Sequence, residues 1–135
     1  MQLSKRTFLA AAGAALAITG LMSTNAWAYS NIDAHTYTKN IDGGTVVFIA
    51  YGEHVGITDG RADGHSVVAL VDIDLPNYGS YTLWNHSGAG EYVDYDFSLP
   101  EGTKVTITAC LGEYGYPGDT GVMWDTCGSS ETGWA

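Results

Sequence analysis

Histidine–serine pairs in Gly-rich stretches are the first candidates for chemistry in this chain. His86 and Ser87 lie in such a stretch at residues 85–90, and His65 and Ser66 follow Gly64. A nucleophilic serine needs a histidine base, an orienting carboxylate and an oxyanion hole, and the second stretch lacks the closing glycine of a nucleophile elbow. Neither stretch supplies that set. We therefore predict two turns, no catalytic residues and a protein that is not an enzyme.

Metal ligation is the second kind of chemistry that the residue types allow. His54 and His65 could meet across a turn in a zinc site, although none of the four histidines has i, i+4 or His-x-His spacing. Asp59 and Asp63 flank a Gly-rich loop that could bind calcium, but the residue order of an EF-hand loop is absent. We expect solvated turns, no metal and no cofactor. The other members of these two sets are His35, His86, Asp72 and Asp74.

A carboxylate pair could also act as the acid and base of a glycosidase. Asp94 and Asp96 meet the required separation of roughly 5 to 9 Å. Two residues apart on a strand, however, they share one open face instead of facing each other across a cleft. We interpret them as a solvated strand face.

The two cysteines are Cys110 and Cys127. In an exported protein an even pair of cysteines is most simply a disulfide. On the chain-entropy model, the loop that it closes stabilises the fold by roughly 3 kcal/mol. A metal site would need further ligands at characteristic spacing, and a catalytic thiol would need a reducing compartment. We therefore predict one disulfide.

The start of the chain predicts export. Lys5 and Arg6 form a positive region, the apolar stretch Phe8–Met22 follows, and residues 26–28 have the small-x-small form of a cleavage site. The apolar stretch is shorter than the about 20 residues of a transmembrane helix. Residues 1–28 are predicted to be a signal peptide for the general secretory route, with the twin-arginine route as the alternative because Ser4–Leu9 resembles that motif with one lysine replacing an arginine. The mature protein would be secreted and extracellular.

Charge limits the partners of the mature chain. After residue 28 only Lys39, Arg61 and Lys104 are basic, against 15 acidic residues, which leaves a net charge of −12. Nucleic-acid binding depends on clustered lysine and arginine, and anionic membrane surfaces are disfavoured for the same reason. The composition predicts neither nucleic acid nor a membrane as a partner.

Short β-branched and aromatic segments separated by turn residues predict an all-β fold. About seven strands with regular punctuation are typical of a single small β-sandwich, with a small barrel as the alternative. The sandwich domain is predicted to span residues 43–135. The expected strands are Thr45–Tyr51, Glu53–Thr58, His65–Asp74, Ser80–Asn85, Glu91–Leu99, Thr103–Leu111 and Gly121–Cys127.

Alternation along the sixth of these strands predicts where the disulfide lies. Cys110 follows the polar positions Thr106 and Thr108, opposite a face of four apolar residues. If Val122 and Trp124 face the core, the second cysteine also points outward. The disulfide should then pin the C-terminal segment to the outer surface of a sheet, rather than link two sheets through the core.

Residues 29–42 are polar with spaced apolar members and are interpreted as a leader. The leader is either flexible or able to add a strand to the sheet edge of a partner. Trp134 has no evident core role. The predicted partner-binding residues are Ile32, Tyr37, Ile41 and Trp134. Further aromatic residues could form a sugar-stacking or protein-binding surface, with core packing as the alternative for the first two: Trp84, Trp124, Tyr92, and Tyr114 or Tyr116.

Five short segments of the mature domain carry a resemblance to a protein family. They are residues 51–54, 62–66, 83–85, 100–103 and 109–110. On these segments the chain resembles small secreted β proteins of actinomycete-type bacteria, and among them the small adaptor subunit of umbrella toxins, which are secreted antibacterial particles. The resemblance implies that residues 29–42 form a strap that threads into a lectin-like subunit, while the body holds a large toxin subunit.

These features favour a secreted, non-enzymatic adaptor domain that binds other proteins. The resemblance makes it a subunit of an extracellular toxin complex used in competition between bacteria. The alternative is a free-standing secreted domain that binds carbohydrate or inhibits a protease. Trp134 would carry the sugar binding, and the loop Tyr114–Thr120 would carry the inhibition.

Overall fold

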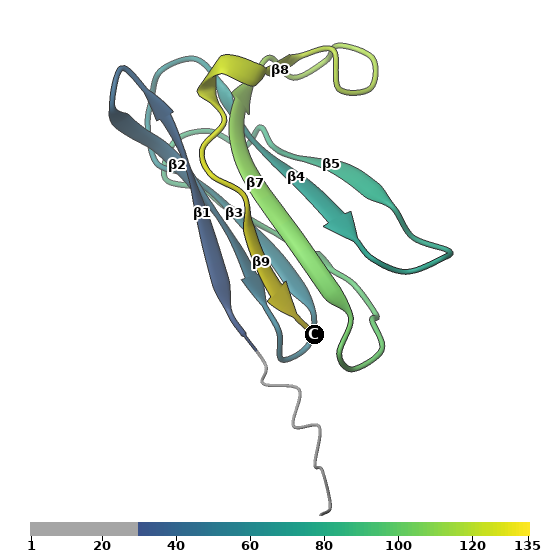
Figure 1. The fold of residues 1–135 in the computed structure, drawn as a ribbon. Coiled ribbons are helices and arrows are strands. Elements are labelled where there is room, and N and C mark those ends of the chain that lie inside the picture. Colours follow the sequence, from purple (N-terminus) through teal and green to yellow (C-terminus); the bar gives the residue numbers. More distant parts are fainter. Residues whose placement is uncertain (1–29) are drawn as a thin grey trace, which may run out of the picture.

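A computed structural model describes residues 30–135, so the predicted signal peptide lies outside the described residues. The described chain forms nine β-strands and one 3₁₀ turn, η1 (Figure 1). The all-β class predicted from the sequence is confirmed. The elements are β1 (Ile32–Thr38), β2 (Ile41–Ile49), β3 (His54–Asp59), β4 (Ser66–Ile73), β5 (Ser80–Asn85), β6 (Tyr92–Asp96), β7 (Lys104–Gly112), β8 (Val122–Met123), η1 (Trp124–Thr126) and β9 (Glu131–Trp134).

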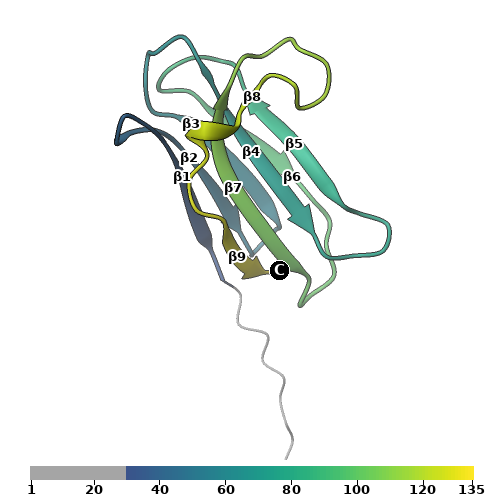
Figure 2. The ribbon, with the colours of Figure 1, turned by 45° about the horizontal axis from the view of Figure 1, so that its top comes forward.

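Two antiparallel sheets pack face to face, which confirms the predicted sandwich (Figures 1 and 2). Sheet A has the strand order β1-β2-β3-β6. Sheet B has the order β5-β4-β7-β8, and β9 also pairs with β7. β8 and β9 lie along the same edge of β7 but at opposite ends, because β8 pairs with Leu111 and Gly112 while β9 pairs with the stretch from Lys104 to Ile107.

Alternating apolar residues from both sheets form the main core. Phe48 and Ile57 from sheet A meet Val71 and Ile107 from sheet B, and all four are essentially inaccessible to solvent. Each β-branched or aromatic side chain sits on the inward side of its pleat, as the period of two requires. Asn85 and Thr36 are fully buried polar residues of the sandwich.

The predicted leader is wrong as a separate segment, because most of it forms β1. This strand pairs along its length with β2, and its Ala34 and Thr36 are buried. The domain therefore begins before residue 43. On its other side β1 approaches the C-terminal segment: the Thr36 hydroxyl donates to the Thr126 carbonyl (2.7 Å), and the Trp134 N–H donates to the Ser30 hydroxyl (3.0 Å). These bonds partly close one side of the sandwich.

The turn between β1 and β2 explains why the first strand was missed. Lys39 and Asn40 both have positive φ, 52° and 63°, as in the two-residue turns that match the twist of a hairpin. Asparagine tolerates this conformation, but lysine adopts it rarely. The usual Asn-Gly or Asp-Gly signal is therefore absent, and the segment reads as an unstructured leader.

The disulfide between Cys110 and Cys127 is confirmed, and so is its place on the outer face of a sheet. Cys110 packs with Val68 and Val122 in a small cluster separate from the main core, and this cluster buries it fully. The predicted strand Gly121–Cys127 is wrong beyond Met123, where η1 begins. The assumed phase is wrong as well, since Val122 lies in the outer cluster and Met123 packs against the main core. Trp124 therefore lies on the outward side, and 59% of its surface is exposed.

Candidate functional site

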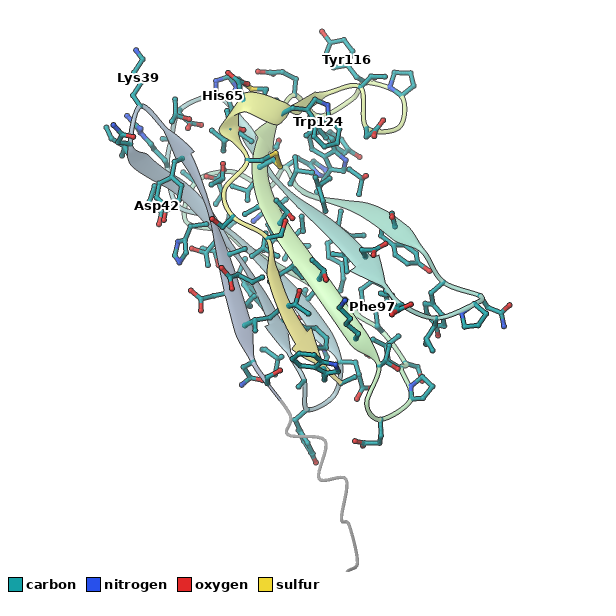
Figure 3. The ribbon with its side chains drawn as sticks, viewed as in Figure 1. Lys39, Asp42, His65, Phe97, Tyr116 and Trp124 are labelled. Atoms are coloured by element: carbon teal, nitrogen blue, oxygen red, sulfur yellow. A yellow bond between two sulfur atoms is a disulfide. The ribbon has the colours of Figure 1, made fainter. Side chains whose placement is uncertain are left out.

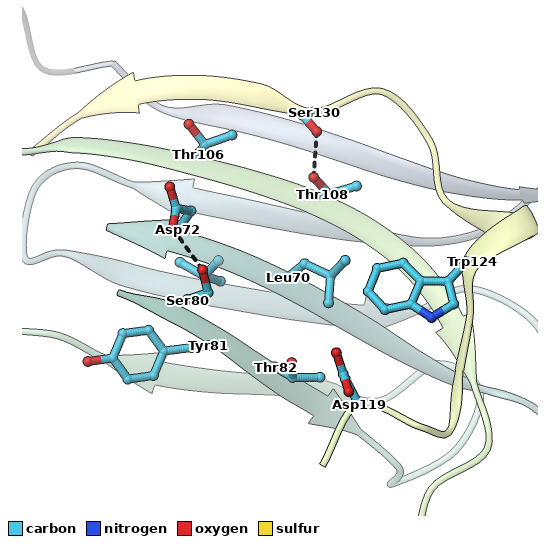
Figure 4. A pocket seen from close by; sticks show the side chains of 11 residues that line it. Leu70, Asp72, Ser80, Tyr81, Thr82, Thr106, Thr108, Asp119, Trp124 and Ser130 are labelled. Carbon is cyan, nitrogen blue, oxygen red and sulfur yellow. Dashed lines mark hydrogen bonds between the residues drawn. The ribbon is translucent and has the colours of Figure 1, made fainter. Parts of the chain in front are cut away.

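The outward face of sheet B carries an open groove of about 340 Å³, which we call the outer groove (Figure 4). Its floor follows from strand register, since β4 pairs with β5 on one side and with β7 on the other. Residues facing each other across three strands form rows on one face of the sheet. The two rows of the floor are Leu70, Thr82 and Thr108, and Asp72, Ser80 and Thr106.

Trp124 stands at one end of the outer groove, with its indole ring toward Leu70 (Figure 4). The segment that carries it is fixed by the buried Thr126. The Thr126 hydroxyl donates to the Met123 carbonyl (2.6 Å) and accepts from the Leu111 N–H (2.8 Å). The neighbouring disulfide ties the same segment to β7. An exposed indole is therefore held in place by buried bonds behind it.

The loop between β7 and β8 brings Asp119 to the same end of the groove, beside Thr82 (Figure 4). This loop rests on Trp84. A Cβ atom at Gly112 would lie 2.7 Å from the Trp84 indole, so the absence of a side chain permits the close approach. Tyr114 packs edge-on against the same indole, with ring centroids 5.7 Å apart. Trp84 is thus a platform for the loop, and Figure 3 shows Tyr116 and Trp124 at this end of the molecule.

The lining of the outer groove is suited to binding rather than to bond breaking. It combines hydroxyl groups, two carboxylates and one indole, and it contains no basic residue. Four of the hydroxyls already have partners: Ser80 donates to Asp72 (2.9 Å), Thr106 lies 3.0 Å from the Thr132 hydroxyl, and Thr108 and Ser130 are 2.6 Å apart. Within residues 30–135, the carboxylate of Asp119 and the indole N–H of Trp124 make no hydrogen bond. A polar ligand in the groove would gain hydrogen bonds to these two groups.

A second hollow, of about 230 Å³, lies between the β3–β4 and β5–β6 loops and brings together His65, Ser66 and His86. His65 Nδ1 lies 2.6 Å from the Glu113 carboxylate. The His86 ring instead stacks on Tyr114, with centroids 3.8 Å apart. No hydrogen bond among the described residues joins a serine hydroxyl to a histidine, so the arrangement lacks the nucleophile–base contact of a hydrolase.

The histidines are dispersed, each beside its own partner. Burial lowers the pKa of His35, but the hydrogen bonds and charges of Asp33 and Asp42 outweigh it, and the pKa is raised above its ordinary 6.5. His54 Nδ1 lies 2.7 Å from Asp94 on β6. Within the described part of the chain, no three His, Cys, Asp or Glu side chains gather as metal ligands would.

Except for Asp72, the carboxylates considered for a glycosidase or a calcium site lie outside the lining of the outer groove. Asp94 accepts from the Tyr92 hydroxyl, and burial together with this carboxylate raises the pKa of Tyr92. Asp96 lies exposed at the end of the same edge strand. Asp59 and Asp63 cap their own loop by accepting from the N–H groups of Arg61 and His65.

The four predicted partner-binding residues do not form one surface. Ile32 packs against the main core, and Trp134, which is 38% exposed, lies at the same end of the sandwich. Tyr37 and Ile41 are about half exposed but lie at the other end of β1, beside the hairpin turn. Ile32 is therefore a structural residue, and no single partner contact is implied for the set.

The outer groove was not predicted from the sequence, although the outward position of two of its residues was. The outward phase of Thr106 and Thr108 was predicted from the alternation of β7. The positions of Asp119 and Ser130 come from loops whose paths depend on Trp84 and on the pairing of β9 with β7. No local pattern in the sequence indicates that these two residues meet the face of sheet B.

Comparison with known proteins adds no relative, since no family model, no curated protein and no solved structure matches this chain. The described residues also include no helix with the length and hydrophobicity of a membrane-spanning segment.

Proposed function

We propose that this chain is a secreted, non-enzymatic binding domain whose ligand lies in the outer groove. One observation carries the proposal: Trp124 is 59% exposed, yet the segment bearing it is fixed by a disulfide and by the hydrogen bonds of Thr126. Those restraints do not bury the indole. They hold it at one position over a concave face, which lowers the entropic cost of binding a ligand there.

The chemistry of the groove supports binding over catalysis. Its carboxylates are Asp72 and Asp119, its other titratable side chain is the Tyr81 phenol, and Asp72 already accepts a hydrogen bond from Ser80. The histidines that could act as general bases line the second hollow or lie on sheet A. A site with an aromatic wall and a hydroxyl-rich floor can bind a ligand through complementary contacts. It offers no activated nucleophile that would transform the ligand.

The adaptor role in a secreted toxin complex is the finer version of this proposal. Residues 32–38, which the resemblance assigns to a strap, are paired in β1. An adaptor with this fold would therefore contact a lectin-like subunit and a large toxin subunit through its body. The end strands β5 of sheet B and β6 of sheet A are edges to which such a protein could add a strand.

The test is capture of ligands by the immobilised mature protein from culture supernatant and cell-wall material of the producing cells. Trp124→Ala is compared with Tyr51→Ala, because Tyr51 is 84% exposed and lies at the turn between β2 and β3, far from the groove. We expect the unchanged protein and Tyr51→Ala to capture the same material, and Trp124→Ala to lose it.

Three results would contradict the proposal. Capture that Trp124→Ala leaves unchanged would remove the groove as the site, and loss of capture on Trp134→Ala alone would move the site to the opposite end of the sandwich. Absence of any captured material from all sources would argue against a binding domain.

A further inference from the structure

We infer that the outer groove takes a saccharide chain that bears free amino groups. This inference rests on the proposed function, because it names the ligand class of the same site. It is carried by the juxtaposition of an exposed indole, a hydroxyl-lined floor and two carboxylates in a lining that contains no Lys, Arg or His (Figure 4).

The indole supplies a flat apolar surface above a polar floor. Trp124 stands over Leu70 at one end, while the floor beyond it carries Thr82, Thr106 and Thr108. A pyranose ring has one face of C–H groups and an edge of hydroxyl groups. An indole attracts the first, and threonine and carboxylate oxygens pair with the second. A purely apolar ligand would leave the polar floor unpaired, at a cost in desolvation.

The hydrogen-bonding capacity of the floor matches a polyol. Each hydroxyl has one donor and two acceptor positions, so Thr108 keeps capacity after pairing with Ser130. An ionised carboxylate accepts at about four positions, and among the described residues none of those of Asp119 is occupied by a hydrogen bond. Asp119 could therefore bind two adjacent sugar groups at once.

Charge selects the amino group. Asp72 and Asp119 both line the groove, no Lys, Arg or His does, and the whole chain carries a net charge of −10. Uronic acids and sulfated sugars would be repelled. A protonated sugar amine would be attracted to the carboxylates and to the indole face, since ammonium groups bind over tryptophan rings.

The groove is open and of modest size, about 340 Å³, which is near the lower end of small-molecule sites. It accepts a segment of a chain rather than enclosing a whole ligand. A lysine-rich peptide would share the positive charge, but it lacks the ring face and the vicinal hydroxyls that the rest of the lining would pair. Peptide binding is therefore an outcome that the test must separate.

The experiment is calorimetric titration of the mature protein with three probes: glucosamine oligomers, N-acetylglucosamine oligomers of the same length, and oligolysine. The titrations are run at about pH 6, where a sugar amine is protonated, at low salt and at about 0.5 M salt. We expect the glucosamine oligomer to bind about tenfold more tightly than the acetylated one at low salt. This preference should shrink to about twofold at high salt because screening removes most of the attraction.

Two variants assign the effect to the groove. Trp124→Ala should weaken both sugars at least tenfold, because it removes the stacking surface. Asp119→Asn keeps the shape of the side chain and should weaken the glucosamine oligomer more than the acetylated one, so that the preference between the two sugars shrinks, while Asp72 keeps part of it. Tyr51→Ala is the matched control, and near-ultraviolet circular dichroism reports whether each variant is folded.

Three results would overturn the inference. Equal or tighter binding of the acetylated oligomer would show a neutral sugar as the ligand. Oligolysine binding as tightly as glucosamine would show attraction between charges alone. If no sugar binds while capture from supernatant still depends on Trp124, the sugar inference fails and the proposed binding function stands. If no sugar binds and capture does not depend on Trp124 either, both fail.

Discussion

Replacing the buried Thr126 with valine should destabilise the fold far more than removal of a surface-exposed hydroxyl would. The Thr126 hydroxyl is the acceptor for the N–H of Leu111, a fully buried residue, at 2.8 Å. Valine has a similar shape but leaves that N–H without a partner, which costs about 1 to 3 kcal/mol. The Met123 carbonyl loses its donor in the same substitution. We expect a loss of about 2 kcal/mol in the free energy of unfolding.

This loss corresponds to a measurable change in melting temperature. An entropy of unfolding of about 2.1 cal/mol/K per residue, over a domain of roughly 100 residues, converts about 2 kcal/mol into about 10 °C. Differential scanning calorimetry checks the value. Thr132→Val is the control, because the Thr132 hydroxyl pairs with Thr106 on the sheet surface (3.0 Å), where water can replace it. A drop under about 3 °C for Thr126→Val, or equal drops for the two variants, would refute the reasoning.

Three further predictions concern the other restraints. Replacing Cys110 and Cys127 together with alanine should lower stability by about 3 kcal/mol, and a reducing agent should lower the melting temperature of the unchanged protein but not of this variant; equal sensitivity of both to the reducing agent would contradict it. Asn85→Leu should cost about 2 to 4 kcal/mol in urea unfolding, because this buried amide donates to the Ile57 and Glu91 carbonyls (2.9 and 2.8 Å); a change below about 0.5 kcal/mol would count against it. The raised pKa of His35 means that its contribution to stability is complete below pH 6.5 and is lost as pH rises through the folded-state pKa. Because the ring is about one-third exposed, the contribution should stay below about 1 kcal/mol. Urea unfolding at a series of pH values should show this fall in stability for the unchanged protein and not for His35→Gln.

The sequence predicted the parts of this fold that depend on period-two alternation. β5 was placed at its observed bounds, and the phase of β7 correctly put Cys110 on the outer face together with Thr106 and Thr108. The reason is that a strand with one buried face must place its apolar residues on that face. Alternation is thus a reliable guide in the longer strands, whereas in the two-residue β8 it does not fix the phase.

The errors occurred where a strand ends or turns without the usual residues. β1 was missed because Lys39 occupies a positive-φ position that sequence preferences assign to glycine or asparagine. For Trp124 the sequence left a core position and an exposed binding surface open, and the core position assumed a strand with Val122 facing inward. In the structure, Val122 joins the outer cluster of Cys110 while Met123 packs against the main core, so β8 has the opposite phase and Trp124 lies on its outward side. The 3₁₀ turn η1 begins at this tryptophan.

The same turn links the stability of the sandwich to the shape of the outer groove. Thr126 contacts both layers, since its hydroxyl accepts from Leu111 on sheet B and its carbonyl accepts from Thr36 on sheet A. The position of Trp124 therefore depends on bonds to strands far from it in the sequence. A binding surface built on such a junction should be more sensitive to buried polar substitutions than to changes on the free loops. Thr126→Val should accordingly weaken sugar binding at temperatures where the domain is still folded, although residue 126 does not line the groove.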